Sequence, residues 1–514
     1  MVPESGGTYI EGVVGQPRYL NPILCQGNEP DEDISSLVFS GLTRVGEGGI
    51  MEPDLALRWE IADEGRTYTF YLRPDARWQD GEPISADDVV FTIRLLQDPA
   101  FPGRPEVAEL WRDVQVEEVE PLAVRFALKS PYAPFLEYTS LGILPEHLLR
   151  DVPLNRLAAD AFNARPIGSG PYRVVRSSPS EISLQASDSY YGRQPFLHRL
   201  VFRFYPDART AADALRRGAI QGLGRVSAAS VQSIEQRQEH ALLSAPELSR
   251  LTLLILNNKY PPLSRPEVRK AISYALDRGR LIEVGLGGQG QTALGPIIPS
   301  SWAFRPDLAR PNYDQAKARE LLEEAGWRDV DGDGVREQSG QRLHLVLLTN
   351  DNPERARVAD EIRRQLAAVG IEVELQGAPW VDLVQKFLVP HNFQMVLAEQ
   401  SFPNADPDVY PFWHSSQIAE GLNFAGWSNR KADDLLERAR QTTDRSQREV
   451  LYEEFQKVFV EEEPSVLLYY PVYTYAVSKE IRGVRLGLLL ASEDRFRYAD
   501  EWYVKTRLLF RFPG

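Results

Sequence analysis

Cysteine is almost missing from this chain of 514 residues, because Cys25 is the only one. A single cysteine excludes an internal disulfide, so stability must come from packing, and we interpret Cys25 as a small apolar filler. A catalytic thiol would need a histidine partner, and none of the six histidines lies near Cys25 in the sequence. Long apolar runs are missing too, since no stretch approaches the roughly 20 residues that a membrane-spanning helix needs.

Positive charge is also scarce. The chain has 58 basic and 73 acidic residues, a net charge of −15, and no basic stripe. This balance argues against nucleic acid and against anionic membrane surfaces as partners. The remaining composition, 43% hydrophobic and 25% charged, is that of a folded globular protein. A chain of this length exceeds a single core, so we expect two to four domains.

The stretch from residue 52 to residue 91 is the most informative part of the sequence. Residues 67–72 alternate apolar and polar side chains, which predicts a half-buried strand. Asp80-Gly81 is typical of a tight turn. Ser85 stands where a helix N-cap belongs, with Asp88 three residues later and an apolar run behind it. The stretch contains no nucleophile, metal cage or phosphate loop, so we interpret it as scaffold.

The carboxyl-terminal half alternates helical and strand patterns. We predict one helix over residues 266–284, a strand over 343–349, a helix over 354–369 with Asn352 as its N-cap, and a strand over 371–375. The last three elements form a βαβ unit, which requires a parallel sheet with a right-handed crossover.

As a whole, residues 52–91 resemble the signature of the extracellular solute-binding proteins of the peptide/nickel ABC transporter family, bacterial solute-binding protein family 5. Four further stretches repeat the resemblance in the right order: residues 6–22, 166–172, 266–278 and 406–408. The resemblance implies an α/β, periplasmic-binding-protein-like fold with two lobes, an extra subdomain and a ligand cleft between the lobes. The implied division is lobe 1 from residues 1–44, 166–254 and 475–514, the extra subdomain from 45–165, and lobe 2 from 255–474.

The resemblance also implies a function without catalysis. The chain would be the substrate-binding component of an ABC importer, a monomer that captures a peptide-like solute and delivers it to a membrane permease. An oligosaccharide, an opine-type conjugate or a metal chelate is the alternative ligand. Two further function classes are a ligand-free signalling receptor or chaperone and, more remotely, an exported hydrolase with Asp406 and Asp408 as its acid and base.

Two features of the sequence bear on localisation. Met1 to Gly7 contains neither a basic segment nor an apolar run, so we expect no signal peptide in this sequence. The resemblance implies instead an extracellular or periplasmic receptor, a lipoprotein or secreted protein, whose leader is absent from this chain.

The segment after the expected strand 393–397 is the candidate ligand site, because ligands in open α/β sheets lie beyond the carboxyl ends of strands. It combines an aromatic, an amide and carboxylates, as binding pockets do. The alternative is a solvated loop capped by Asp-Pro turns. Trp380 and Trp413 could stack on a ligand or pack in the core, and the resemblance places two residues of lobe 1 at the ligand. The predicted contacts are Asn28, Glu29, Trp380, Gln400, Phe402, Pro403, Asn404, Asp406, Asp408 and Trp413.

Two positions depart from the family pattern. In the peptide-binding members that this chain resembles, an aspartate four residues before the equivalent of Pro407 pairs with the α-amino group of the ligand. That position is Pro403 here, and the tryptophan expected seven residues before Pro407 is Gln400. We therefore expect that ligands with a free α-amine are not preferred.

A second chemical pattern lies at residues 329–337. Its alternating carboxylates, followed by a glycine at the sixth position, match the first half of an EF-hand loop. The twelfth position is Gly340, so the bidentate glutamate is missing. The sequence is compatible with a Ca²⁺ site and with a metal-free turn. In either case the loop would have a structural role and no catalytic one. The candidate ligands are Asp329, Asp331, Asp333, Val335 and Glu337.

Overall fold

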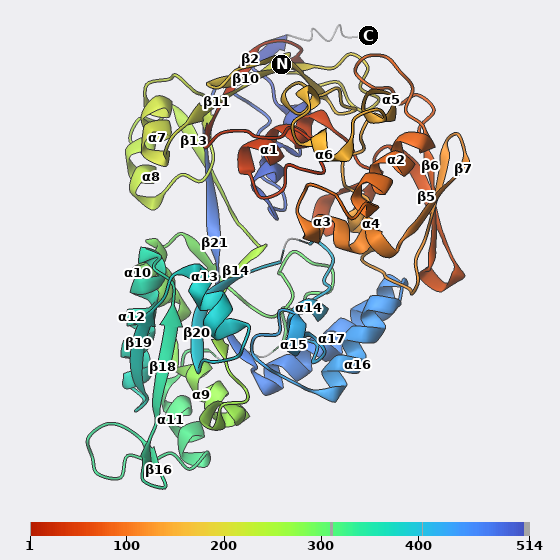
Figure 1. Cartoon of the computed structure of the whole chain (residues 1–514). Coiled ribbons are helices and arrows are strands. Elements are labelled where there is room, and N and C mark those ends of the chain that lie inside the picture. Colours follow the sequence, from red (N-terminus) through yellow and green to blue (C-terminus); the bar gives the residue numbers. More distant parts are fainter. Residues whose placement is uncertain (1, 309–311, 403, 508–514) are drawn as a thin grey trace, which may run out of the picture. The chain divides into compact units, whose positions relative to one another are not determined.

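The computed structural model describes residues 2–308, 312–402 and 404–507. The chain forms two compact units (Figure 1): unit 1 comprises Met1–Ala245 and Tyr473–Gly514, and unit 2 comprises Pro246–Val472. Strand β13 (His240–Pro246) leads the chain into unit 2, and β21 (Ser465–Ser478) leads it back. The predicted lobe boundaries, 254/255 and 474/475, lie beyond the observed unit boundaries, 245/246 and 472/473. The first differs because β14 (Arg250–Leu256) pairs along its whole length with strand β20 of unit 2.

The main sheet of unit 1 has the strand order β12-β2-β11-β10-β9. Strand β2 is parallel to β11 and β12, whereas β10 is antiparallel to both β11 and β9. The carboxyl end of β21 pairs with β12. The bounds are β2 Thr8–Val14, β9 Tyr172–Ser177, β10 Glu181–Ala186, β11 Arg199–Tyr205 and β12 Gly222–Leu223.

A second sheet in unit 1 is antiparallel and has the order β5-β6-β8-β7. Helix α2 (Ala86–Gln97) packs on β7 and β8. Asp88 accepts from the Ser85 backbone N–H (2.9 Å) and from Trp78 Nε1 (3.3 Å), so the predicted N-terminus of this helix is confirmed. Trp78 is fully buried, which confirms its scaffold role. The bounds are β5 Ala56–Ala62, β6 Thr67–Leu72, β7 Gln115–Glu120 and β8 Ala123–Ala127. The extra subdomain 45–165 stays a prediction.

The sheet of unit 2 has the order β19-β18-β20-β14, followed by the amino-terminal part of β21. Strands β18 (His344–Thr349) and β19 (Glu372–Gly377) are parallel and flank helix α12 (Pro353–Ala367), so the predicted βαβ unit is confirmed. Asn352 caps α12 by accepting from the backbone N–H groups of Glu354 (2.8 Å) and Arg355 (3.2 Å). Strand β20 (Met395–Ser401) lies between β18 and β14.

The single helix predicted over residues 266–284 is wrong. The structure has two helices there, α9 (Pro266–Ala275) and α10 (Arg278–Leu286), separated by an extended Leu276. Asp277 causes the break, because its carboxylate caps α10 at the Arg280 backbone N–H (3.0 Å) while its own N–H donates to Gln365 (2.7 Å).

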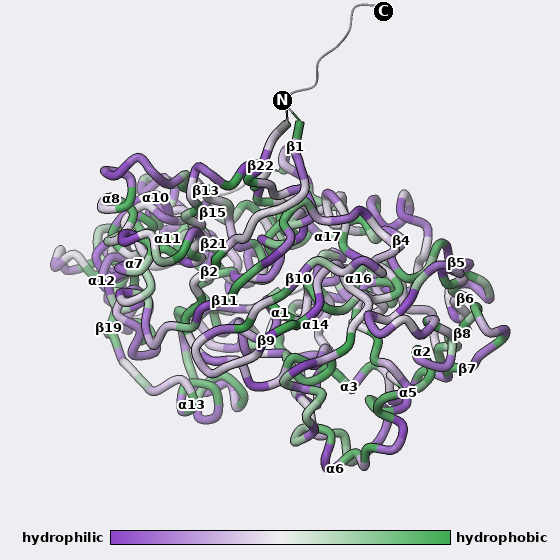
Figure 2. The backbone as a smooth tube through the Cα atoms, turned by 90° about the horizontal axis from the view of Figure 1, so that it is seen from above, coloured by the Kyte–Doolittle hydropathy of each residue, from purple (hydrophilic) through white to green (hydrophobic). Residues whose placement is uncertain are grey.

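Each unit has its own apolar core. Figure 2 shows polar and apolar residues interspersed along the elements. In the part of the chain that the structure describes, no helix combines the length and the apolar character needed to cross a membrane. Strand β1 (Val2–Glu4) pairs with β22 (Lys505–Arg507) and thereby joins the two ends of unit 1.

Candidate ligand-binding site

The expected strand 393–397 is observed as β20 (Met395–Ser401), so the predicted ligand segment begins inside this strand, at Gln400, and continues beyond its carboxyl end. The Arg250 guanidinium donates to both carboxylate oxygens of Glu399, from Nε (3.0 Å) and Nη2 (2.9 Å). Its third nitrogen donates to Glu247 (3.1 Å), which is almost fully buried. The Phe402 backbone N–H donates to the Ser249 carbonyl (2.7 Å) and so continues the pairing with β14. The start of the segment is therefore fixed to its neighbour strand.

Neighbouring side chains of the segment point to opposite faces, as they do along any strand. The Phe402 ring is buried and lies 4.1 Å from the Phe412 ring, and Gln400 donates to the Leu422 carbonyl (3.4 Å). Both side chains thus contact the 410–424 segment of unit 2. The opposite face carries the Glu399–Arg250 pair and the exposed Ser401. Asn404 is half-buried, and Pro403 lies outside the described residues.

Two ion pairs fix the far end of the segment. Arg448 on α17 (Arg445–Glu462) binds both carboxylate oxygens of Asp406, at 2.8 and 2.6 Å. Arg440 on α16 (Arg430–Gln441) binds Asp408 through Nε (3.0 Å) and Nη2 (2.6 Å). Burial raises the pKa of Asp408, and Arg440 opposes that rise. The geometry gives both carboxylates an anchoring role, and ligand contact by either stays a prediction.

The two tryptophans have different surroundings. Trp413 is 2% exposed, and its ring lies 4.7 Å from the Phe459 ring. The structure therefore favours core packing over ligand stacking for Trp413. Trp380 begins the short helix α13 (Trp380–Asp382) and is 44% exposed, which leaves its ring available to a ligand.

In unit 1, the predicted contacts lie at the amino end of α1 (Glu29–Val38). The side chain of Asn28 donates to the Gln16 carbonyl (3.1 Å) and to Asp31 (2.6 Å), so it fixes the turn before the helix. Glu29 accepts from Arg225 Nε at 3.1 and 3.3 Å. Sequence reasoning missed Arg225, because no local pattern pairs residues so far apart in the chain.

A buried charge network holds α1 in unit 1. Arg495 donates to Asp33 (2.7 Å from Nη1) and to Glu11 (3.0 Å from Nε), and all three side chains are buried. Burial raises the pKa of Asp33 to about 7, and Arg495 opposes the rise. Glu11 also accepts from Tyr475 (2.9 Å). The helix that presents Asn28 and Glu29 is thus held at its middle by polar contacts to β2 and the carboxyl-terminal segment.

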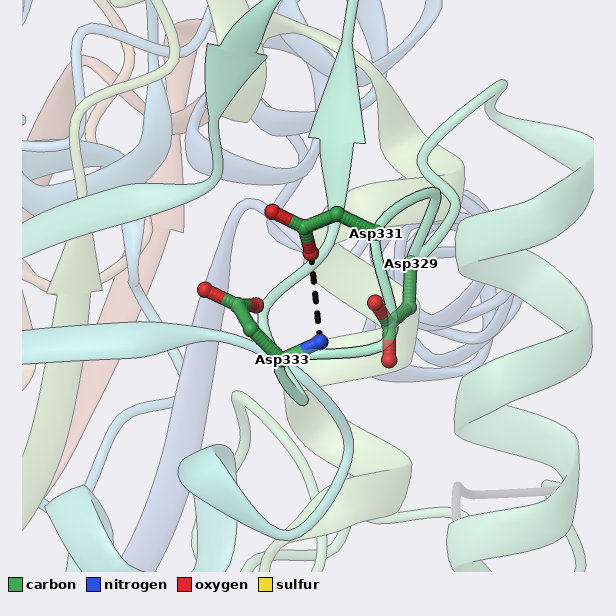
Figure 3. Close-up of side chains that lie close together, drawn as sticks. All are labelled: Asp329, Asp331 and Asp333. Carbon is green, nitrogen blue, oxygen red and sulfur yellow. Dashed lines mark hydrogen bonds between the residues drawn. The ribbon is translucent and has the colours of Figure 1, made fainter.

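The acidic loop after α11 (Gln315–Glu324) brings three carboxylates together. Asp329, Asp331 and Asp333 offer oxygens that lie within 4.8 Å of one another (Figure 3). The carboxylates also accept backbone N–H groups of the loop, as from Asp333 to Asp331 (3.1 Å), and Arg342 pairs with Asp333 (2.8 Å). Among the described residues Glu337 does not join this cluster, since it begins β16 (Glu337–Gln338), and Val335 donates its N–H to Asp333 (2.8 Å). The Ca²⁺ prediction and the metal-free turn both fit this geometry.

Two α/β units connected by two strands are the architecture expected of a bilobal solute-binding protein. The chain belongs to the bacterial extracellular solute-binding proteins of family 5, whose sequence profile matches residues 51–420. The predicted family and fold are therefore confirmed. This family consists of binding proteins, so the prediction that the chain is not an enzyme is also confirmed, and the hydrolase alternative falls.

Individual relatives match over nearly the whole chain. The oligopeptide-binding protein AppA of Bacillus subtilis is 31% identical over 98% of this chain and 93% of its own length. The dipeptide-binding protein of Escherichia coli is 26% identical over 91% of this chain and 90% of its own. The solved structure of AppA with a nonapeptide covers 98% of this chain and 100% of AppA, with a TM-score of 0.72 and 30% identity. The solved structure of NikZ from Campylobacter jejuni with Ni(L-His) covers 96% of this chain and 99% of NikZ, with a TM-score of 0.73 and 27% identity.

Proposed function

We propose that this protein binds a peptide-like solute outside the cytoplasm and delivers it to the membrane permease of an ABC importer. Relatives over nearly the whole chain are named for oligopeptides and dipeptides, and AppA was solved with a nonapeptide. The family comprises extracellular proteins, which supports the location. A monomer attached to the cell surface by a lipid anchor is the form that we propose.

The anchored segment after β20 is the observation that carries this proposal. Arg250 holds its beginning, and Arg448 and Arg440 hold its end. A segment that is already ordered loses little conformational freedom when a ligand binds, so more of the contact energy appears as affinity. Extended ligands suit such a segment, because main-chain groups next to a strand can pair with a peptide backbone.

A metal chelate or an opine-type conjugate is the second candidate ligand. Pro403 supports it, because proline at this position cannot supply the carboxylate that pairs with a peptide amine in the peptide-binding members. NikZ, with which this chain shares 27% identity, was solved with Ni(L-His). A ligand without a free α-amine would fit a site of this composition.

Identification of the bound solute tests the proposal. The purified full chain is analysed by native mass spectrometry, and calorimetric titrations follow with dipeptides, longer peptides, histidine–nickel chelates and oligosaccharides. We expect one solute per chain and saturable binding of at least one peptide class. Binding of the chelates alone would favour the second candidate, whereas saturation by oligosaccharides alone would contradict both.

A further inference from the structure

The turn that leads into β20 fixes the ring of His391. This residue has a φ of 53°, a left-handed conformation that histidine adopts more readily than most residues other than glycine. Its backbone N–H donates to the Leu388 carbonyl (3.1 Å), and its carbonyl accepts from the buried side chain of Asn257 (3.1 Å). The ring stacks on Phe393, with 23° between the ring planes. Backbone and ring are therefore both held in place.

Both ring nitrogens of His391 lie at hydrogen-bond distance from backbone carbonyls. Nδ1 is 3.0 Å from the Phe424 oxygen, and Nε2 is 2.9 Å from the Ile418 oxygen. A carbonyl oxygen only accepts, and a neutral imidazole has a single N–H, so the neutral ring bonds one carbonyl and turns a lone pair toward the other. The protonated ring has two N–H groups and bonds both, and its bonds are strengthened by the charge.

No carboxylate pairs with this ring in the described part of the chain, because its hydrogen bonds are those to the two carbonyls. The side chains on the adjoining elements that are charged or titrate between about pH 5 and pH 8 are Lys259, His344, Glu374, Lys386, His414 and Glu420. His344 lies 3.7 Å from Glu374, Lys386 pairs with Asp382 (3.0 Å), and His414 lies 3.2 Å from Glu437. The two carbonyls are thus the groups that distinguish the two protonation states of His391.

The stretch that these two bonds hold, residues 418–424, also supports the predicted ligand segment. It starts on α15 (Gln417–Glu420). The Leu422 carbonyl accepts from the side chain of Gln400 (3.4 Å), which is a predicted ligand contact. The Leu422 N–H donates to the Pro411 carbonyl (3.2 Å) on α14 (Tyr410–Trp413). A looser hold on residues 418–424 would therefore loosen the support of Gln400.

We propose that His391 is a positioning residue of the ligand site and that it acts in its protonated form. At low pH both carbonyls are bonded. As pH rises through the range in which histidines titrate, about pH 5 to 8, one of the two bonds is lost, so residues 418–424 loosen and the affinity for the solute falls. The effect on affinity rests on the proposed function, whereas the effect on residues 418–424 does not.

Hydrogen exchange of the full chain at pH 6 and pH 8, measured by mass spectrometry, tests the proposal without a ligand. After correction for the intrinsic pH dependence of exchange, we expect residues 418–424 to exchange about fivefold faster at pH 8, the factor for one lost hydrogen bond. His391→Asn should abolish this difference, because asparagine suits a left-handed backbone and does not titrate. His198→Asn is the control and should preserve the difference, since His198 is exposed and its ring contacts the Ser5 hydroxyl.

Two carboxyl groups of unit 1 also titrate near this range. Burial raises the pKa of Asp33 to about 7 and that of Asp54 to about 6. Both are present in the wild type and in His391→Asn, so comparison of the two proteins removes their contribution.

Calorimetric titration with N-acetyl-trialanine measures the effect on binding, because this probe has no group that titrates between pH 6 and pH 8. We expect its affinity to fall about fivefold from pH 6 to pH 8 in the wild type and in His198→Asn. In His391→Asn the affinity should be nearly the same at the two pH values.

A corrected exchange rate of residues 418–424 that is equal at pH 6 and pH 8 in the wild type would overturn the proposal, and this result needs no variant. An undiminished pH dependence in a folded His391→Asn protein would also overturn it. The expected exchange pattern in a chain that binds no peptide would support the hold of His391 on residues 418–424 and contradict the proposed function, so the two failures are distinguishable.

Discussion

Two arginines hold the predicted ligand segment to the helices that follow it in the sequence. Arg448 and Asp406 are 7% and 13% exposed, and Asp408 is 4% exposed in its pair with Arg440. Two carboxylates that the sequence predicts as ligand contacts are thus structural anchors, and their contact with a ligand stays a prediction. The sequence could not distinguish these roles, because the partner arginines lie on two later helices.

Arg448→Ala should destabilise the protein strongly. Asp406 would lose this partner in a largely buried position, and breaking a buried ion pair costs about 3–5 kcal/mol. Urea unfolding measures the free energy of unfolding. The control is Arg438→Ala on α16, whose pair with Asp434 is 60% and 62% exposed, for which we expect a loss of about 0.5 kcal/mol or less. Equal losses in the two variants would contradict the anchoring role.

Asp54 should make stability depend on pH. Burial raises the pKa of this carboxyl from 3.8 to about 6, although the Tyr191 hydrogen bond, Arg44 and Arg73 oppose the rise. Between about pH 4 and pH 6 the folded state then binds more protons than the unfolded state, so the free energy of unfolding falls as pH rises. The loss through Asp54 is about 2–3 kcal/mol across this window.

Asp54→Asn removes this titration. Urea unfolding at several pH values should show that the free energy of unfolding of the variant rises relative to that of the wild type between about pH 4 and pH 6. Above about pH 6 the difference between the two proteins should stay constant. A difference that stays constant from pH 4 to pH 6, or that changes in the opposite direction, would contradict the raised pKa.

Pro403 should weaken the preference for free amines. We expect N-acetylated peptides to bind at least as tightly as the same peptides with a free amine, because a charge partner is missing at this position. Pro403→Asp should then improve binding of the free-amine peptide about tenfold, while the acetylated one gains nothing. Calorimetry compares the two peptides on both proteins. Tighter binding of free peptides to the wild type would show the prediction to be wrong.

At the scale of elements, the sequence predicts structure best where a local pattern decides it. Strand β6, the capped start of α2 and the βαβ unit of unit 2 follow from alternation, capping and helical spacing. The helix over 266–284 fails because one side chain, Asp277, forms a cap that apolar spacing does not reveal. The Arg250–Glu399 pair forms because β14 pairs with β20, and the Arg225–Glu29 pair joins residues that are far apart in the sequence. No local sequence pattern predicts either pair.

Ca²⁺ binding by the Asp329–Asp333 cluster would stabilise the acidic loop before β16. Millimolar Ca²⁺ should then raise the melting temperature of the protein, and a chelator should reverse the change. Asp331→Ala should abolish this response, whereas Asp360→Ala, a change at an exposed carboxylate on α12, should leave it intact. An unchanged melting temperature after chelation would support the metal-free turn.

At the scale of the whole molecule, the protein has two units and two strands that lead from one to the other. Each unit has its own core and its own set of predicted contacts: Asn28 and Glu29 in unit 1, and the segment after β20 in unit 2. A ligand changes such a molecule only as far as it binds one arrangement of the units more tightly than another. No step of that process breaks or forms a bond in the solute.

The fate of the solute therefore tests the central claim most directly. The full chain is incubated with a peptide that it binds, the complex is denatured, and the solute is weighed by mass spectrometry at increasing times. We predict that its mass and amount stay constant over many times the dissociation time, with one molecule bound per chain. Release of shortened or otherwise altered peptide at a rate proportional to protein concentration would contradict a function in binding alone.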